Sequence, residues 1–187
     1  MTRLGVFGGQ FDPPHNGHLA VVRAARDQLG LDRVLVVPSS RPPHRAAPQT
    51  PAETRYRLAL AAFADEPRVE VSRLELDRPG PSYTVDTLEQ LALPGQELYL
   101  ILGADQLAAL GSWHRPDRVR ELARVAVAAR PGAPHAEDAE ELVMQPVAAA
   151  SSDLRRSVAD GVDVSDLVPA GVVAAIGREG LYRPTPC

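Results

Sequence analysis

The 187-residue sequence contains no lysine, and its 20 basic residues are all arginines. A Walker A phosphate-binding loop needs a lysine, so this way of binding a nucleotide is excluded. Chemistry through a lysine Schiff base is excluded for the same reason. If the protein binds phosphate groups, the donors must be arginine side chains, histidine side chains and backbone N–H groups.

Cysteine is almost absent too, because Cys187 is the only one. A single thiol cannot form an internal disulfide, and no cluster of cysteines and histidines with metal-site spacing surrounds it. No apolar run approaches the roughly 20 residues that span a membrane, and the first residues lack a signal-peptide core. The net charge of −4 gives no overall attraction for nucleic acids. We therefore expect a cytoplasmic protein with neither membrane nor nucleic-acid partners.

Short apolar runs alternate with stretches of helical spacing along the whole chain. The runs predict strands at 4–7, 34–37, 69–71, 98–102 and 125–128. The stretches between and after them predict helices at 18–29, 54–63, 84–91, 118–123, 156–159 and 168–176. This alternation predicts a doubly wound, mainly parallel α/β sheet within a single domain over 1–187. In such sheets ligands bind beyond the carboxyl ends of the strands, where the strand order reverses.

The segment 8–18, with the sequence GGQFDPPHNGH, directly follows the first predicted strand. Its two leading glycines let the backbone approach a ligand closely. His15 and His18 are three residues apart at the entrance of the next predicted helix, for which Asn16 is the expected N-cap. A helix N-terminus attracts anions, so this turn predicts a phosphate site. The simpler alternative is a structural turn with two exposed histidines.

This segment resembles the G-G-x-F-D-P-x-H-x-G-H signature of the nucleotidyltransferase superfamily, which implies a Rossmann-like fold. The resemblance implies that His15 and His18 are catalytic, because they contact ATP phosphates and stabilise the charge on departing pyrophosphate. The residues of the segment that it assigns to ATP binding are Gly8, Gly9, Phe11, His15, Gly17 and His18. The dehydrogenase fingerprint G-x-G-x-x-G is absent, which argues against a dehydrogenase.

Three other segments resemble motifs of the bacterial nicotinate-nucleotide adenylyltransferases. They are PPHR at 42–45, SYTVDTL at 82–88, and the stretch from Gly103 to Trp113, the only tryptophan. Taken alone, these segments also fit a solvated basic loop, a helix N-terminus and a core aromatic. The resemblance assigns seven residues to the mononucleotide: His44, Arg45, Tyr83, Thr84, Gly103, Asp105 and Trp113.

The segment SSDLR at 151–155 resembles the family motif I-S-x-T-x-[IV]-R, which holds the ATP phosphates. Alanines replace its isoleucine and its first serine, while Ser152 keeps a hydroxyl and Arg155 keeps the positive charge. The resemblance implies that Ser151, Ser152 and Arg155 belong to the ATP site. Serines at a helix start would also satisfy free N–H groups without any ligand.

Together these motifs imply transfer of the adenylyl group of ATP to nicotinate mononucleotide, giving deamido-NAD and pyrophosphate in NAD biosynthesis. The motifs are cationic and glycine-rich, so we expect catalysis by alignment and charge stabilisation. Mg²⁺ is expected to arrive with ATP, with no metal ligands from the protein. Alternatives are a phosphopantetheine adenylyltransferase and a non-catalytic nucleotide sensor. The sequence leaves open the choice between nicotinate and nicotinamide mononucleotide, the role of Cys187 and the oligomeric state, with which a homo-oligomer is compatible.

Overall fold

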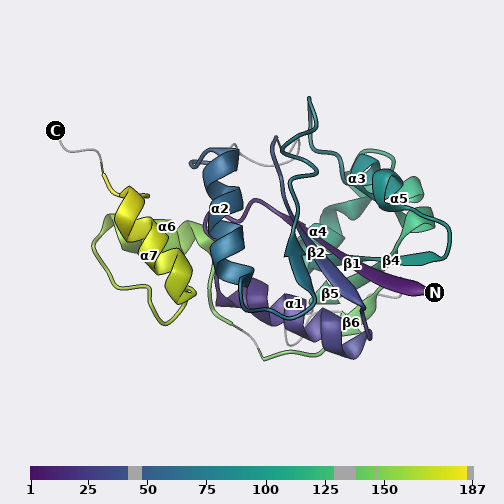
Figure 1. The fold of residues 1–187 in the computed structure, drawn as a ribbon, viewed down its shortest axis with the longest axis horizontal. Coiled ribbons are helices and arrows are strands. Elements are labelled where there is room, and N and C mark those ends of the chain that lie inside the picture. The colour runs from purple at the N-terminus through teal and green to yellow at the C-terminus, as the bar shows by residue number, and fades with distance from the viewer. Residues whose placement is uncertain (42–47, 129–137, 146, 185–187) are drawn as a thin grey trace.

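The computed structural model describes residues 1–41, 48–128, 138–145 and 147–184. Its centre is a six-stranded parallel sheet with the order β3-β2-β1-β4-β5-β6 (Figure 1). The strands are β1 (Thr2–Gly9), β2 (Arg33–Pro38), β3 (Val69–Val71), β4 (Gln96–Gly103), β5 (Arg124–Ala128) and β6 (Glu140–Leu142). The predicted doubly wound fold is confirmed. β6 was not predicted, because its sequence, Glu-Glu-Leu, contains no apolar run.

Strand β1 lies in the middle of the sheet and is covered on both faces. Val6 aligns with Leu35 of β2 and Leu100 of β4, and all three belong to one buried cluster. Phe7 aligns with the next residue of each neighbouring strand, and these three side chains belong to a second buried cluster. Because successive side chains point to opposite faces, the apolar run of β1 builds both cores.

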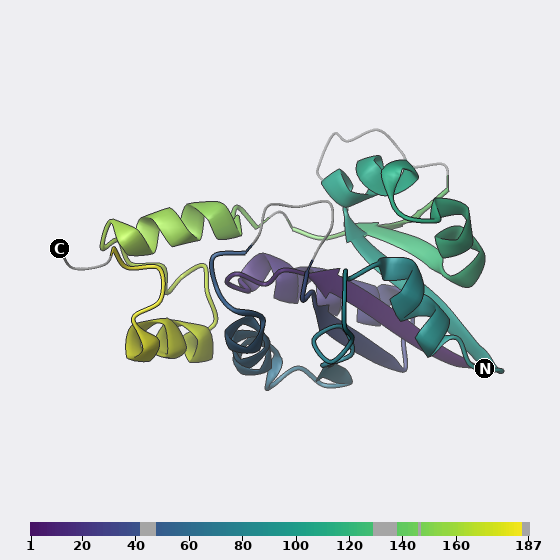
Figure 2. The same ribbon diagram turned by 90° about the horizontal axis from the view of Figure 1, so that it is seen from above.

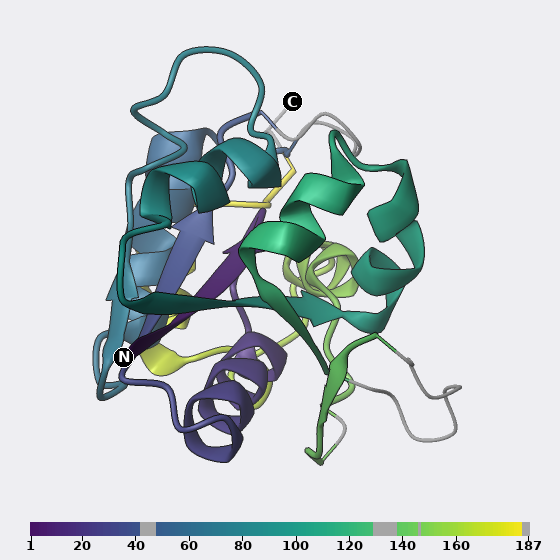
Figure 3. The ribbon, with the colours of Figure 1, turned by 90° about the vertical axis from the view of Figure 1, so that its right-hand side faces the viewer.

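The helices divide between these two clusters. Helices α1 (Asn16–Gln28), α2 (Ala52–Phe63), α6 (Ser151–Ala159) and α7 (Ala170–Glu179) contribute to the cluster around Phe7. Helices α3 (Thr84–Leu91), α5 (Pro116–Leu122) and, through Leu107, α4 (Ala104–Ala109) pack on the other face. Figure 3 shows α1, in purple, and α3, in teal, on opposite sides of the sheet. No helix in the described part of the chain is long and apolar enough to cross a membrane.

Helices α6 and α7 lie side by side at the end of the molecule away from the N-terminus (Figure 2). Ser151 and Ser152 are in the first turn of α6 rather than ahead of the helix, as the predicted start at 156 had placed them. Helix α7 begins at Ala170, and Pro169 is its N-cap, so its predicted start at 168 was two residues early.

The start of α1 also differs from the prediction. His15 is the N-cap, and Asn16 is the first helical residue. The Asn16 backbone N–H donates to the Leu167 carbonyl oxygen (2.9 Å), and its side-chain amide donates to the Asp166 carbonyl oxygen (3.0 Å). Asn16 therefore fastens the helix start to the segment before α7 instead of capping its own helix.

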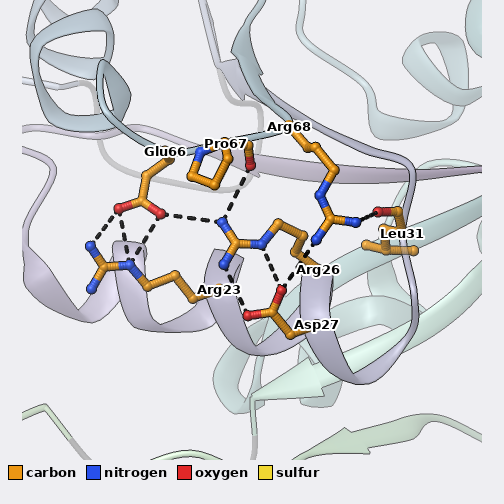
Figure 4. A network of polar contacts seen from close by, with 7 residues as sticks. All are labelled: Arg23, Arg26, Asp27, Leu31, Glu66, Pro67 and Arg68. Carbon is orange, nitrogen blue, oxygen red and sulfur yellow. Dashed lines mark hydrogen bonds and ion pairs between the residues drawn. The ribbon is translucent and has the colours of Figure 1, made fainter.

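A network of charged side chains joins the C-terminal half of α1 to the connection between α2 and β3 (Figure 4). Arg23 Nε donates to Glu66 Oε1 (2.9 Å), and Arg26 Nη1 lies 3.4 Å from Glu66 Oε2. Arg26 Nε also donates to Asp27 (2.8 Å), and Arg68 Nη1 donates to the Leu31 carbonyl oxygen (2.9 Å). The side chain of Glu66 is only 6% exposed. Each arginine of this network contacts a carboxylate.

Candidate active site

Two adjoining cavities open where β1 and β4 end, which is the point at which the strand order reverses. The larger has a volume of about 840 Å³ and the smaller about 320 Å³. Five residues line both cavities: Gly8, Gly9, Gln10, Asp105 and Gln106. Two ligands can therefore lie next to each other across Gly8 and Gly9, which end β1 two residues later than predicted. These glycines and the residues after them up to His15 are called the glycine turn below.

The larger cavity brings together all nine residues that the sequence assigned to ATP. Gly8, Gly9, Phe11, His15, Gly17 and His18 come from β1 and the turn into α1, and Ser151, Ser152 and Arg155 come from α6. More than a hundred residues separate these two segments in the sequence. Their role in binding ATP stays a prediction, since the structure contains no ligand.

The two histidine rings are packed together, with their centroids 3.8 Å apart. The His15 backbone N–H donates to His18 Nδ1 (3.1 Å). Because Nδ1 accepts this bond, a neutral His18 carries its ring proton on Nε2. The Phe11 ring lies edge-on to His18 at 5.1 Å and is buried. The Phe11 ring therefore packs against the His18 ring and limits its movement. The Phe11 backbone is in the left-handed region (φ 52°).

His15 is uncharged at neutral pH. Its side chain is buried, and burial lowers the pKa of His15 to about 4. Its Nδ1 atom is buried without a hydrogen-bond partner among the described residues. In the ligand-free protein, desolvation therefore disfavours the imidazolium form of His15, so its expected positive charge stays a prediction for the ligand-bound site.

Asp12 ties the turn to distant parts of the chain. Asp12 Oδ1 accepts a hydrogen bond from the Tyr182 hydroxyl (2.8 Å), and Oδ2 accepts one from the Gln49 N–H (2.9 Å). Its backbone carbonyl oxygen accepts from Arg155 Nη1 (2.8 Å), while Arg155 Nε is buried without a partner among the described residues. Burial also raises the pKa of Tyr182. The sequence analysis assigned no site role to Tyr182, which lies 170 residues from Asp12.

Arg55 of α2 also holds this turn, through hydrogen bonds to backbone carbonyl oxygens. The sequence analysis did not predict this role. Arg55 is 1% exposed and donates to the carbonyl oxygens of Gln10 (2.7 Å), Ser39 (2.7 Å) and Thr50 (3.0 Å). Burial lowers its pKa, although a guanidinium remains protonated in proteins. A charged residue in a predicted helix is normally exposed, so the sequence did not indicate that Arg55 is buried.

The smaller cavity collects four residues predicted to hold the mononucleotide, namely Tyr83, Thr84, Asp105 and Trp113. Gly103, predicted for the same ligand, lines the larger cavity instead. The predicted residues His44 and Arg45 lie outside the described residues.

The smaller cavity also contains polar residues that sequence reasoning missed. Glu75 is 7% exposed, and its Oε1 accepts a hydrogen bond from Thr87 Oγ1 (2.8 Å). Burial raises the pKa of the Glu75 carboxyl. The His114 ring stacks on Tyr83 with the centroids 4.4 Å apart. Glu75 stands in the irregular segment before α3, where no familiar motif drew attention to it.

The N-termini of α1, α4 and α6 line the larger cavity. Gly17 and His18 lie at the start of α1, and Ser151 and Ser152 at the start of α6. A helix dipole is positive at this end, although the N–H groups of Asn16 and His18 already donate to carbonyl oxygens. Together with Arg155, these helix ends give the cavity the chemistry to bind an anion. Among the described residues no group of three or more His, Cys, Asp or Glu side chains could hold a metal ion.

Comparison with known proteins agrees with this geometry. A family model described as cytidylyltransferase-like matches residues 6–158. A "Probable nicotinate-nucleotide adenylyltransferase" of Thermus thermophilus is 46% identical over 186 residues, which cover 97% of this chain and 100% of the relative. The chain belongs to the cytidylyltransferase-like family and, within it, to the nicotinate-nucleotide adenylyltransferases. The family predicted from the motifs is thereby confirmed, and the chain is a nucleotidyltransferase.

Further relatives support the same conclusion. A protein of the same name from Thermomicrobium roseum is 41% identical over 198 residues and covers 98% of this chain and 92% of its own. A solved structure of a putative enzyme of this kind from Vibrio parahaemolyticus has a TM-score of 0.76 at 22% identity, covering 99% and 98% of the two chains. The Plasmodium falciparum nicotinic acid mononucleotide adenylyltransferase complexed with NaAD has a TM-score of 0.80 at 17% identity, covering 97% and 98%. These two structures confirm the fold.

Proposed function

We propose that this protein transfers the adenylyl group of ATP to nicotinate mononucleotide and releases pyrophosphate, a step of NAD biosynthesis. The observation that carries the proposal is the pair of adjoining cavities that share Gly8 and Gly9 at the carboxyl end of β1, with two packed histidines at the wall of one of them. A transfer between two nucleotides needs two sites in contact, and this arrangement provides them.

We place ATP in the larger cavity. His18, whose neutral ring has a donor on Nε2, is proposed to stabilise charge on the phosphates. Arg155 and the N-terminus of α6 are proposed to hold the far end of the triphosphate. An anion near His15 favours its protonated form, so triphosphate binding is proposed to raise the low pKa of this side chain.

We place the mononucleotide in the smaller cavity. Its lining includes the apolar side chains of Val37, Leu100 and Leu102. Tyr83 and Trp113 add flat aromatic rings, which suits a pyridine ring. Thr84 and Asp105 provide polar groups for the rest of the ligand. The proposed contribution of His44 and Arg45 rests on the sequence motif alone.

The proposed reaction is one in-line displacement. A phosphate oxygen of the mononucleotide forms a bond to the α-phosphorus of ATP, and the bond from that phosphorus to the bridging oxygen breaks. Pyrophosphate leaves with the bonding electrons. The attacking oxygen is already anionic at neutral pH, so no general base and no covalent enzyme intermediate is required. The protein supplies alignment and charge stabilisation.

We infer that Mg²⁺ enters as part of the ATP complex. In phosphoryl transfer the metal bridges phosphate oxygens and neutralises the charge that develops there. Of the carboxylates that line this cavity, Asp12 accepts hydrogen bonds from Tyr182 and Gln49, and Asp153 pairs with Arg156. We therefore infer that phosphate oxygens and water would hold the ion. Loss of turnover on chelation of divalent metal, and its recovery on adding Mg²⁺, would test this inference.

The test of the proposed function is release of pyrophosphate from ATP with each of three acceptors. They are nicotinate mononucleotide, nicotinamide mononucleotide and phosphopantetheine. We expect the highest kcat/KM with nicotinate mononucleotide. Faster turnover with phosphopantetheine would identify the other adenylyltransferase, and tight ATP binding without turnover on any acceptor would identify a nucleotide sensor.

A further inference from the structure

The side chain of Ser39 is a buried hydroxyl without a hydrogen-bond partner among the described residues. Ser39 directly follows β2, is 9% exposed and lines the smaller cavity. Its backbone is fully engaged, because its N–H donates to the Gly9 carbonyl oxygen (2.8 Å) and its carbonyl oxygen accepts from Arg55 (2.7 Å). The backbone therefore holds the hydroxyl in place while the hydroxyl itself stays unused.

Two other hydroxyls of the same cavity have hydrogen-bond partners within the protein. Thr87 Oγ1 donates to Glu75, and Ser82 Oγ accepts from the N–H groups of Ser40 (3.0 Å) and Arg41 (3.2 Å). Leaving a buried polar group without a partner costs stability, so native structures contain few of them. Ser39 Oγ is covered in the ligand-free protein, so the side chain has to rotate about χ1 towards the cavity before a partner that arrives with the ligand can bond it.

We propose that Ser39 Oγ binds the phosphate of the mononucleotide, donating a hydrogen bond to a non-attacking oxygen. The inference rests on the proposed function. The attacking phosphate must lie where the two cavities meet, because it has to reach the α-phosphorus in the larger one. Gly9 lines both cavities, and the hydrogen bond from the Ser39 N–H to Gly9 fixes Ser39 beside that junction.

The location also favours phosphate over the pyridine ring as the partner. A hydroxyl bonds an anionic oxygen more strongly than a neutral one, and the bond would fix the phosphate for in-line attack. Arg55 lies directly behind the Ser39 carbonyl oxygen, so a buried positive charge also stands on this side of the junction.

The central test is Ser39→Ala. We expect kcat/KM for nicotinate mononucleotide to fall about 10- to 100-fold, which corresponds to the loss of one hydrogen bond to a charged group. The KM for ATP is expected to stay within about twofold of the wild-type value, since Ser39 lines only the smaller cavity. The melting temperature of the free protein should be unchanged or higher, because an unpaired hydroxyl has been removed.

Ser72 offers a matched control. It directly follows β3, and its N–H donates to the Val36 carbonyl oxygen of the neighbouring strand (2.8 Å), as Ser39 does to Gly9. Its hydroxyl already accepts a hydrogen bond from the Leu74 N–H (3.2 Å), and it lines neither cavity. We expect Ser72→Ala to lower the melting temperature slightly and to leave the constants for both substrates unchanged.

Calorimetric titration with nicotinate mononucleotide and with nicotinate riboside, which lacks the phosphate, identifies the bonded group. Ser39→Ala should weaken binding of the nucleotide and leave binding of the riboside unchanged. Equal weakening of both ligands would overturn the assignment to phosphate, as would wild-type constants in the variant. If the wild-type protein releases no pyrophosphate, the proposed function fails, and the titration still tests Ser39 by itself.

Discussion

Two groups of arginines differ in the kind of partner they have. Arg55 and Arg155 contact the glycine turn, and the others belong to the network at the C-terminal half of α1. Arg23, Arg26 and Arg68 form ion pairs with Glu66 or Asp27. Arg55 and Arg155 form no ion pair within the described parts of the chain, and they donate to backbone carbonyl oxygens instead.

The difference distinguishes arginines that stabilise the fold through ion pairs from arginines at the proposed ATP site. In the network of Figure 4, each positive charge meets a carboxylate, so the group contributes to packing and leaves little charge for a ligand. At the turn, Arg55 and Arg155 donate to carbonyl oxygens, and the buried Asp12 carboxylate also interacts electrostatically with Arg55. Arg155 lines the larger cavity and has no ion pair in the described parts of the chain, so it is the guanidinium that we propose meets the triphosphate.

The largest effect is expected for Arg55→Met, on the turn side of the comparison. The substitution leaves several buried carbonyl oxygens without donors, so the free energy of unfolding should fall by about 3–5 kcal/mol. Urea unfolding measures this change. Arg57→Met on the same helix is the control, because Arg57 is half exposed and its ion pair with Glu179 contributes at most about 1 kcal/mol. Equal losses in the two variants would contradict the distinction.

His18→Ala tests the catalytic side of the turn. Loss of one well-aimed donor should lower kcat about 10²- to 10³-fold, or roughly 3–4 kcal/mol in the barrier. The substitution also removes the acceptor of the His15 N–H, so the melting temperature should be recorded alongside steady-state kinetics. Near-normal turnover in a folded variant would remove His18 from the mechanism.

His15 makes the stability of the free protein depend on pH. Its pKa is about 4 in the folded state against 6.5 for an unperturbed histidine, so the unfolded chain binds the proton first as the pH falls. Its contribution is present in full above about pH 6.5 and is lost as the pH falls towards 4, by about 3 kcal/mol at most. Urea unfolding at pH 7 and pH 4.5 should show a smaller loss for His15→Asn than for the wild type; equal losses would refute the assignment.

The smallest effect is expected for Glu66→Gln in the network of Figure 4. The substitution removes the negative charge but keeps a side-chain oxygen that accepts hydrogen bonds from Arg23 and Arg26, so the free energy of unfolding should fall by about 1–2 kcal/mol. Because the network lines neither cavity, kcat and both KM values should remain at wild-type levels. A fall in kcat without a fall in stability would show that the two groups of arginines are coupled.

The sequence predicted much of the fold because strand and helix periodicity are local properties. Four strands of the sheet follow from continuous apolar runs and β3 from two valines on either side of Glu70, whereas β6 has too few apolar residues to show such a pattern. The walls of the larger cavity were found because the signature around His15 and His18 occupies consecutive positions. Tyr182 could not be found in this way, because it reaches the turn through tertiary structure alone.

The sequence also did not indicate which polar and charged side chains are buried. Arg55 and Glu75 are charged residue types, which are mostly exposed, and only their surroundings show that they are inside the protein. Ser39 stands before a proline-rich segment and has no distinctive pattern. Its unpaired hydroxyl becomes visible only when every buried polar atom is matched with a partner.

The hydrogen bond between Asp12 and Tyr182 makes the proposed nucleotide site depend on the C-terminal helices. Arg155 of α6 and the Leu167 carbonyl oxygen before α7 also bond this part of the chain, so three of its contacts come from residues 155–182. If α6 and α7 detach locally, these contacts are lost while the hydrogen bonds of β1 to β2 and β4 remain. The proposed site is therefore no more stable than the packing of these two helices against the rest of the molecule.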